Sequence, residues 1–148
     1  MTTRADIGVV RRTNIGFLLA KASQRWNELL AEAFRASGHG DVRPSYGSVL
    51  VPLFEEDGLR MGELAARSHL AKQTMTTMVR VVEGAGFVER RPDLEDARAT
   101  RVHLTSRGHR LRPLAAREVA RLERRIEERL GDRRAAALRT ILTEVVAL

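Results

Sequence analysis

The sequence predicts a mainly α-helical protein with one small β-hairpin, an α+β fold in which helices dominate. Two observations lead to this prediction. Apolar residues recur every three or four positions along most of the 148 residues, as they do on the buried face of a helix. Only between residues 87 and 104 does this spacing give way to the alternation of polar and apolar residues that is typical of strands.

The N-terminal part of the chain predicts two helices. Apolar residues keep helical spacing over residues 15–33, and a polar stretch with two glycines, residues 37–41, ends the pattern. Pro44 suits the first turn of the second helix, because proline is tolerated where no helical N–H bond is needed. Pro52 lies inside this second helix, so we expect it to kink the helix or end it early.

Two shorter helices are predicted next, over residues 62–67 and 72–83. Only residues 68–71 separate them, and two helices of this size joined by so short a turn form a helix-turn-helix. The second helix has one apolar face, on which the spacing follows i, i+3, i+4 and i+7. That face consists of Met75, Met78, Val79 and Val82.

A β-hairpin is predicted directly after the helix-turn-helix. Residues 87–91 and 100–104 are the two strand candidates, and the polar residues 92–99 form the loop between them. A hairpin in this position is called a wing. Residues 44–105 are therefore predicted to form a winged helix-turn-helix lobe.

The C-terminal part predicts two more helices. Thr105 or Ser106 can cap a long helix, which Pro113 should kink near its start. Gly131 separates this helix from a last one.

The helices outside the lobe, in residues 1–36 and 106–148, carry more apolar surface than one small lobe can cover. We therefore expect these dimerisation helices to pair two copies of the chain into a homodimer. In DNA-binding proteins, a twofold dimer of helix-turn-helix units places the second helices of its two units about 34 Å apart, which is one turn of DNA. If this chain binds DNA, such a dimer predicts a near-palindromic binding site. The alternative is that these helices pack only on their own lobe.

Several short motifs occur at fixed places within this order of elements. In the wing, Asp93, Asp96 and Arg98 form an Asp-x-x-Asp-x-Arg pattern, and Leu104, Thr105 and Gly108 then form a Leu-Thr-x-x-Gly pattern. Together with residues 62–67, 70–79 and 86–90, these motifs resemble the MarR family of bacterial transcription regulators. The resemblance covers nearly the whole chain, residues 1–148. It implies a sequence-specific regulator, usually a ligand-responsive repressor, that binds double-stranded DNA as a homodimer.

The resemblance has two departures in the helix-turn-helix. His69 stands in a turn where the family often has glycine, and histidine tolerates a left-handed backbone less readily. Ala71 stands where a capping serine or aspartate is frequent, so we expect the helix that follows to have a weaker N-cap.

The face of helix 72–83 opposite its apolar stripe has the chemistry of a major-groove reader. It carries no acidic residue between positions 71 and 82. Glutamine can bridge two atoms of adenine, a threonine methyl can contact a thymine methyl, and basic side chains suit phosphates. The predicted DNA-binding residues of this helix are Lys72, Gln73, Thr74, Thr76, Thr77 and Arg80. The alternative is an ordinary solvated face.

The wing supplies the strongest single DNA-binding candidate. Arg98 lies near the tip of the hairpin, where an arginine can enter a narrow minor groove. Asp96 could hold its guanidinium in place, and the alternative is an ordinary exposed ion pair. Arg90, Arg91 and Arg101 are weaker candidates for phosphate contacts.

The resemblance also implies a small aromatic or anionic effector, bound between the dimer helices and the lobe. Trp26 and Tyr46 are the only tryptophan and tyrosine of the chain, and both lie on elements that would line such a pocket. Arg43 could meet an anionic ligand. The alternative is that Trp26 and Tyr46 are core residues and do not contact a ligand.

Composition argues against several other classes of protein. The absence of cysteine excludes disulfides, thiolate metal sites and thiol redox sensing. The four histidines are scattered without ligand spacing, and there is no glycine-rich phosphate loop. We therefore expect no metal, no cofactor and no enzymatic activity.

Charge and hydropathy add weaker evidence. A net charge of +7 favours a polyanion such as DNA, but most of the surplus falls after residue 105, outside the predicted lobe. No apolar run is long enough to span a membrane, and no apolar stretch follows Arg4, Arg11 and Arg12 as in a signal peptide. A cytoplasmic protein without a membrane partner is expected. A winged-helix protein-interaction module and an architectural DNA binder without a ligand are the alternative functions.

Overall fold

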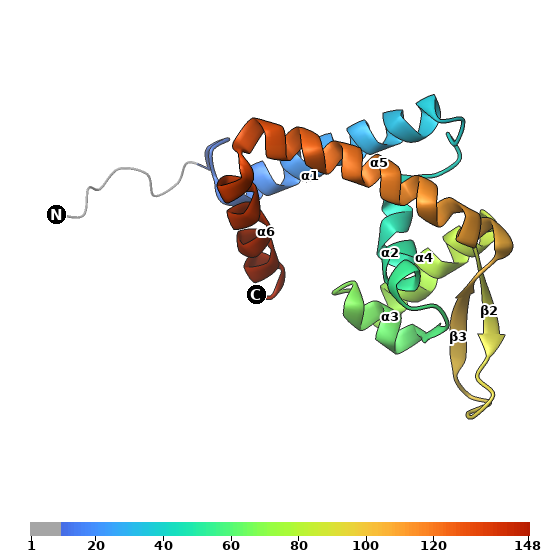
Figure 1. Cartoon of the computed structure of the whole chain (residues 1–148). Helices are drawn as coiled ribbons and strands as arrows, with labels where there is room; N and C mark the ends of the chain where they lie inside the picture. The colour runs from blue at the N-terminus through green and yellow to red at the C-terminus, as the bar shows by residue number, and fades with distance from the viewer. Residues whose placement is uncertain (1–9) are drawn as a thin grey trace.

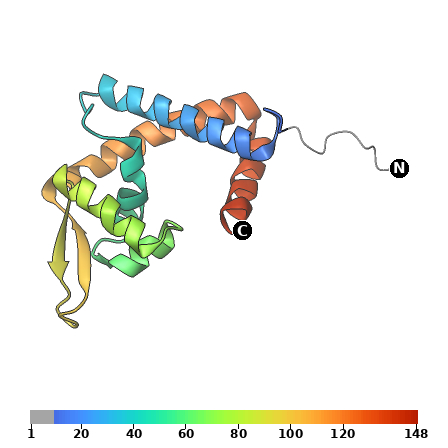
Figure 2. The same ribbon diagram turned by 180° about the vertical axis from the view of Figure 1, so that it is seen from behind.

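The computed structural model describes residues 10–148, which form six α-helices, one short 3₁₀ helix and one three-stranded antiparallel sheet. Two long helices, α1 (Ile15–Ala36) and α5 (Ser106–Leu130), lie side by side, and α6 (Asp132–Val146) follows at the far end of α5 (Figure 1). We call these three helices the scaffold. The lobe, residues 44–105, lies at the other end of α5, as the reverse view also shows (Figure 2). Residues 1–9 of the predicted helical span 1–36 lie outside the described residues.

Both long helices begin with a side-chain cap. The Asn14 side chain accepts the N–H of Phe17 at 2.8 Å at the start of α1, and the Thr105 hydroxyl accepts the N–H of Gly108 at 3.1 Å at the start of α5. Pro113 does not interrupt α5, which continues to Leu130. Inside the scaffold, the buried carboxylate of Glu118 on α5 accepts a hydrogen bond from the Ser37 hydroxyl at the end of α1.

The second predicted helix begins as the 3₁₀ turn Pro44–Tyr46 and continues as α2 (Gly47–Glu55), so the expectation that Pro52 ends it early is wrong. Proline cannot donate a hydrogen bond, which leaves the Ser48 carbonyl without its usual helical donor. The Ser68 hydroxyl, from the turn of the helix-turn-helix, donates to this carbonyl at 2.5 Å. A residue twenty positions away thus replaces the missing bond and lets the helix continue.

Replacing Ser68 by alanine is expected to destabilise the protein by about 1–2 kcal/mol, because a partly buried carbonyl loses its donor. The measurement is urea unfolding of the wild type and the variant. The control is the same substitution in a Pro52→Ala background, where residue 52 regains an N–H for the Ser48 carbonyl. An equal cost in both backgrounds would refute this role of Ser68.

The helix-turn-helix has the predicted form, with α3 (Met61–Arg67) and α4 (Lys72–Gly84) joined by a short turn. His69 in that turn has a left-handed backbone, with φ of 53°, which explains why glycine would suit the position. Ala71 begins α4 without a side-chain cap, as predicted. Met75, Val79 and Val82 are buried against the lobe.

The sheet has one strand more than the predicted hairpin. β2 (Val88–Pro92) pairs with β3 (Thr100–Leu104) from Val88 opposite Leu104 to Pro92 opposite Thr100. The short β1 (Leu59–Arg60) adds to the other edge of β3, with Leu59 opposite Val102. We call β2, β3 and their loop the wing; its base is therefore tied to the start of α3.

The core of the lobe is well filled, whereas parts of the scaffold are exposed. Val49, Leu64, Met75, Val79 and Val102 are fully buried. In the scaffold, apolar side chains of α1 and α6 remain open to solvent, namely Ile15, Leu18, Ile141, Leu142 and Val146. None of the helices in residues 10–148 combines the length and apolar character needed to cross a membrane.

Candidate nucleic-acid interface

The face of α4 that is not buried carries the predicted polar side chains. Lys72, Gln73, Thr74, Thr77 and Arg80 are exposed, and Thr76 is half-buried. The hydroxyls of Thr76 and Thr77 donate to the carbonyls of Lys72 and Gln73 at 2.9 and 3.3 Å. These bonds favour one rotamer for each threonine, so the position of each methyl group is set before a ligand arrives.

The N-terminal end of α4 is suited to an anion. The cap residue Ala71 offers no side-chain acceptor, so the first N–H groups of the helix are not taken by a cap. Lys72, the first residue of the helix, adds a positive charge at the same end. Free helical N–H groups beside a basic side chain form a favourable place for a phosphate.

The tip of the wing presents Arg98 to solvent, with 98% of its side chain exposed. The Asp96 carboxylate accepts the backbone N–H of Arg98 at 3.0 Å, whereas it lies 3.9 Å from the guanidinium. Asp96 therefore shapes the turn more than it holds the charged group. The Arg98 guanidinium remains available for an external anion.

The base of the wing contains a buried carboxylate, that of Asp93, the first residue of the Asp-x-x-Asp-x-Arg motif. Asp93 is 5% exposed and accepts hydrogen bonds from Arg60 Nε at 2.7 Å and Arg101 Nε at 3.0 Å. Arg101 also donates to the Gly58 carbonyl at 2.8 Å. Arg101 therefore stabilises the base of the wing through these two hydrogen bonds. This structural role replaces the phosphate contact that was predicted for it.

The Glu95 backbone N–H, followed by the two guanidinium groups, holds the pKa of Asp93 below its usual range. A lowered folded-state pKa means that the charged carboxylate stabilises the fold at neutral pH, and that this stabilisation is lost as the pH falls through the lowered pKa. We expect Asp93→Asn to reduce the free energy of unfolding at pH 7, with a difference from wild type that shrinks below the ordinary aspartate range. The measurement is urea unfolding between pH 3 and 7. Parallel pH profiles would show that the charge on Asp93 is not the cause.

The other two arginines proposed for phosphate contacts are paired within the lobe. Arg90 contacts Glu83 at 2.9 Å and Arg91 contacts Glu89. The Arg90 side chain and backbone N–H lower the pKa of Glu83. Both arginines are thus partly neutralised by their carboxylate partners.

A hollow of about 440 Å³ lies between the start of α3, the first turns of α4 and the wing. It brings three of the predicted residues to one place, Lys72 and Thr76 from α4 and Arg98 from the wing. Arg60 and Arg90 also line it, and Glu63 is its acidic member. Gln73, Thr74, Thr77 and Arg80 lie outside its lining, along the open face of α4.

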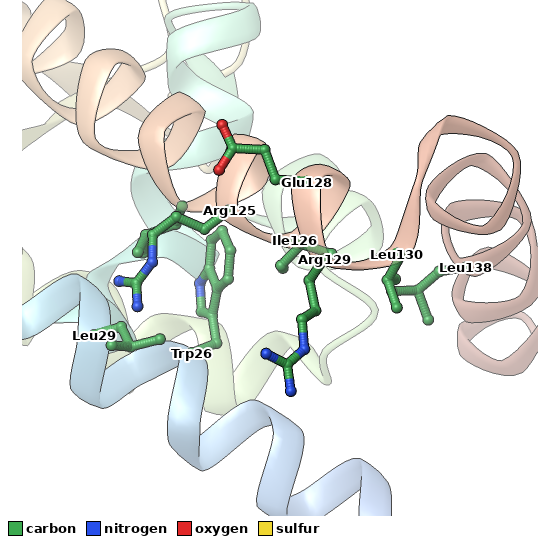
Figure 3. Close-up of a pocket in the computed structure, with 9 residues that line it drawn as sticks. Trp26, Leu29, Arg125, Ile126, Glu128, Arg129, Leu130 and Leu138 are labelled. Carbon is green, nitrogen blue, oxygen red and sulfur yellow. The ribbon is translucent and has the colours of Figure 1, made fainter.

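The predicted effector residues do not meet in one place. Trp26 lines a hollow of about 670 Å³ between α1, α5 and α6, and its indole stands near Arg125 and Arg129 (Figure 3). Tyr46 is buried in the core of the lobe, with its ring 6.2 Å from that of Phe87. Arg43 is exposed just before the 3₁₀ turn. Among residues 10–148, no cluster of three or more potential metal ligands occurs.

Comparison with known proteins gives consistent matches. The model of the MarR family matches residues 44–100. The HTH-type transcriptional regulator TtmR of Methylorubrum extorquens is 36% identical over 74 residues, which are 50% of this chain and 37% of that protein. The exopolysaccharide II synthesis transcriptional activator ExpG of Rhizobium meliloti is 24% identical over 106 residues, 72% of this chain and 54% of that protein. The chain thus spans about a third to a half of the length of these curated relatives.

Solved structures match over more of the chain. The transcriptional repressor CouR, solved bound to a 23-mer DNA duplex, is 25% identical and has a TM-score of 0.76. The match covers 93% of this chain and 98% of that one. A probable transcriptional regulator from Pseudomonas aeruginosa has a TM-score of 0.78 at 24% identity, over 90% of this chain and 97% of that one. The scaffold and the lobe therefore occur together in other proteins.

Proposed function

We propose that this chain, whose residues 44–100 match the model of the MarR family, is a member of that family and a transcriptional regulator that binds a specific site on duplex DNA as a homodimer. The family consists of DNA-binding regulators and not of enzymes. The observation that carries the proposal is the juxtaposition of α4 and the wing. Lys72, Thr76 and Arg98 line one hollow. Further polar side chains, Gln73, Thr74, Thr77 and Arg80, lie along the open face of α4, and residues 71–82 include no acidic residue.

In this proposal each part of the interface has a different task. The open face of α4 reads base edges in the major groove through Gln73, Thr74 and Thr77. The uncapped start of α4, with Lys72, binds a backbone phosphate. Arg98 reaches the adjacent minor groove from the wing tip. CouR, which is similar in fold, was solved bound to a 23-mer DNA duplex, which supports duplex DNA as the ligand.

The exposed apolar residues of α1 and α6 support the homodimer. Ile15 is 74% exposed, and Ile141 and Val146 are 54% and 56% exposed, on helices whose other faces pack within the scaffold. Burying such side chains in a twofold interface removes them from water, which is the usual origin of an isologous dimer. Two lobes related by a twofold axis require a near-palindromic operator.

Ligand-responsive repression is the finer part of the proposal. The hollow beside Trp26 has aromatic and aliphatic walls, and its charged lining residues are Arg125, Arg129 and Glu128. Two basic side chains against one acidic side chain favour a small aromatic anion. Trp26 is the only tryptophan, so its fluorescence reports on this hollow directly. We expect benzoate or a related aromatic carboxylate to change the Trp26 emission and to release bound DNA. If neither the Trp26 emission nor DNA binding responded to such compounds, the proposed ligand response would be refuted, and DNA binding by the regulator would not be affected by that result.

The decisive experiment is binding of the purified full chain to duplexes selected from a random library, compared with a shuffled duplex, at several salt concentrations. The expected result is a preferred near-palindromic sequence, bound by two copies at about a thousandfold or more above the shuffled duplex, with a steep loss of affinity as salt increases. Only weak binding that ignores sequence would favour an architectural role. No binding at all would favour a protein-interaction module.

A further inference from the structure

We propose that Arg107 is a positioning residue that fixes the angle of the recognition helix α4 relative to the scaffold. Arg107 lies in the first turn of α5, where the chain leaves the lobe. Its guanidinium touches two segments that are far apart in the sequence, one at Asp41 and one at residues 85–87. The proposal rests on the proposed function only for its DNA measurements.

The contacts of Arg107 join the scaffold to the C-terminal end of α4. Its Nη2 donates to the carboxylate of Asp41, and its Nη1 donates to the carbonyl of Ala85, the cap residue of α4. The guanidinium carbon lies 4.3 Å from the centre of the Phe87 ring, which is buried in the lobe. A cation at a helix C-terminus also interacts favourably with the helix dipole.

The place of these contacts matters because the chain passes between scaffold and lobe only twice within residues 10–148. It passes once at residues 37–43, between α1 and the 3₁₀ turn, and once at Thr105, between β3 and α5. Asp41 lies in the first passage and Arg107 directly follows the second. Their ion pair therefore spans both passages and opposes a change of angle between the two parts.

The end of α4 is already held to the second passage by backbone geometry. The Thr105 hydroxyl donates to the Gly86 carbonyl at 2.7 Å, and the Thr105 N–H donates to the Phe87 carbonyl at 3.0 Å. These bonds connect α4 to α5 but not to residues 37–43. The Arg107 side chain connects residues 37–43 to the same place through its ion pair with Asp41.

The role is one of geometry more than of stability. Both partners are about half exposed, at 46% and 50%, and an exposed ion pair contributes little to folding. A fixed angle between lobe and scaffold instead sets how well two lobes can reach two half-sites at the same time. When two binding modules are linked, loss of the correct geometry lowers the joint affinity without changing either single contact.

The first test measures the angle without DNA. The chain has no cysteine, so the pair Glu32→Cys on α1 and Val81→Cys on α4 accepts two spin labels, and excess unlabelled protein dilutes the labelled copies. The distance distribution between the labels should broaden in Arg107→Gln and in Asp41→Asn. The control is Arg110→Ala, which removes a positive charge one helical turn after Arg107. The Arg110 side chain is exposed and forms no ion pair within residues 10–148. Unchanged widths in Arg107→Gln and Asp41→Asn would overturn the proposal, whatever the protein binds.

The second test separates geometry from charge. Arg107→Gln removes a positive charge and Asp41→Asn removes a negative one, so simple attraction to DNA would move their affinities in opposite directions. We expect both variants to lose about tenfold in affinity for the duplex with two half-sites, and less than about twofold for a single half-site. Opposite changes, or equal losses on both duplexes, would reject the positioning role. A wild type that prefers no sequence would refute the proposed function, while the label distances still decide the role of Arg107.

Discussion

Arg98→Ala is expected to weaken binding to the selected operator by about a hundredfold, because a homodimer loses two wing contacts worth about tenfold each. The Arg98 side chain is almost fully exposed, and the Asp96 carboxylate lies closer to the backbone N–H of Arg98 than to its guanidinium. Its removal therefore costs DNA contacts without disturbing the lobe. Competition binding at fixed salt measures the loss directly.

Two further variants show what kind of contact is lost. Arg98→Lys keeps the charge but is more strongly hydrated and lacks the planar group that suits a narrow minor groove, so we expect it to recover only part of the affinity. Arg124→Ala, on the exposed side of α5 in the scaffold, removes one charge far from the wing. If Arg124→Ala weakened binding as much as Arg98→Ala, general attraction would explain both and the wing contact would be disproved.

Gly108→Ala is expected to cause the largest loss of stability, about 3 kcal/mol, because overpacking against the backbone cannot be relieved by a rotamer change. A Cβ atom at Gly108 would lie 2.2 Å from the Phe87 carbonyl oxygen and 3.1 Å from a methyl carbon of Leu104. To make room, α5 would have to move away from the sheet. A thermal melt should show a midpoint lower by roughly 10 °C.

The matched control is Gly62→Ala, also in the first turn of a helix. A Cβ atom at Gly62 would meet no other atom within 4 Å, so we expect this variant to be as stable as wild type or slightly more stable. If both alanines cost the same, helix propensity and not crowding would explain the loss at Gly108. The crowding also gives a physical reason for the glycine of the Leu-Thr-x-x-Gly motif.

The fold could be predicted where the pattern is local. The spacing of Met75, Val79 and Val82 gave α4, and the alternation in residues 100–104 gave the wing, because burial on one face leaves a period in the sequence. β1 was missed because two residues are too few to show a period. That α2 continues past Pro52 could not be predicted, because the donor that compensates for the proline, Ser68, lies in another element.

The candidate site was predicted less completely than the fold. Lys72 and Thr76 could be assigned to the open side of α4 from the sequence, because the apolar residues of α4 define its buried face and therefore also the opposite one. For Arg101 the sequence gives no such constraint, since a long guanidinium can reach solvent or a buried acid with equal ease. Only the positions of Arg60 and Gly58 show that Asp93 and Arg101 belong to the support of the wing.

The pairing of β1 with β3 also has a consequence for the order of folding. Leu59 and Val102 are neighbours in the sheet, although both helices of the helix-turn-helix and the first wing strand lie between them in sequence. Closing so long a loop costs entropy before any strand contact is gained, so α3, α4 and the β2–β3 hairpin should form first. The two residues of β1 then complete the lobe as its slowest step, and the last part to fold is the one that joins both ends of the DNA-reading unit.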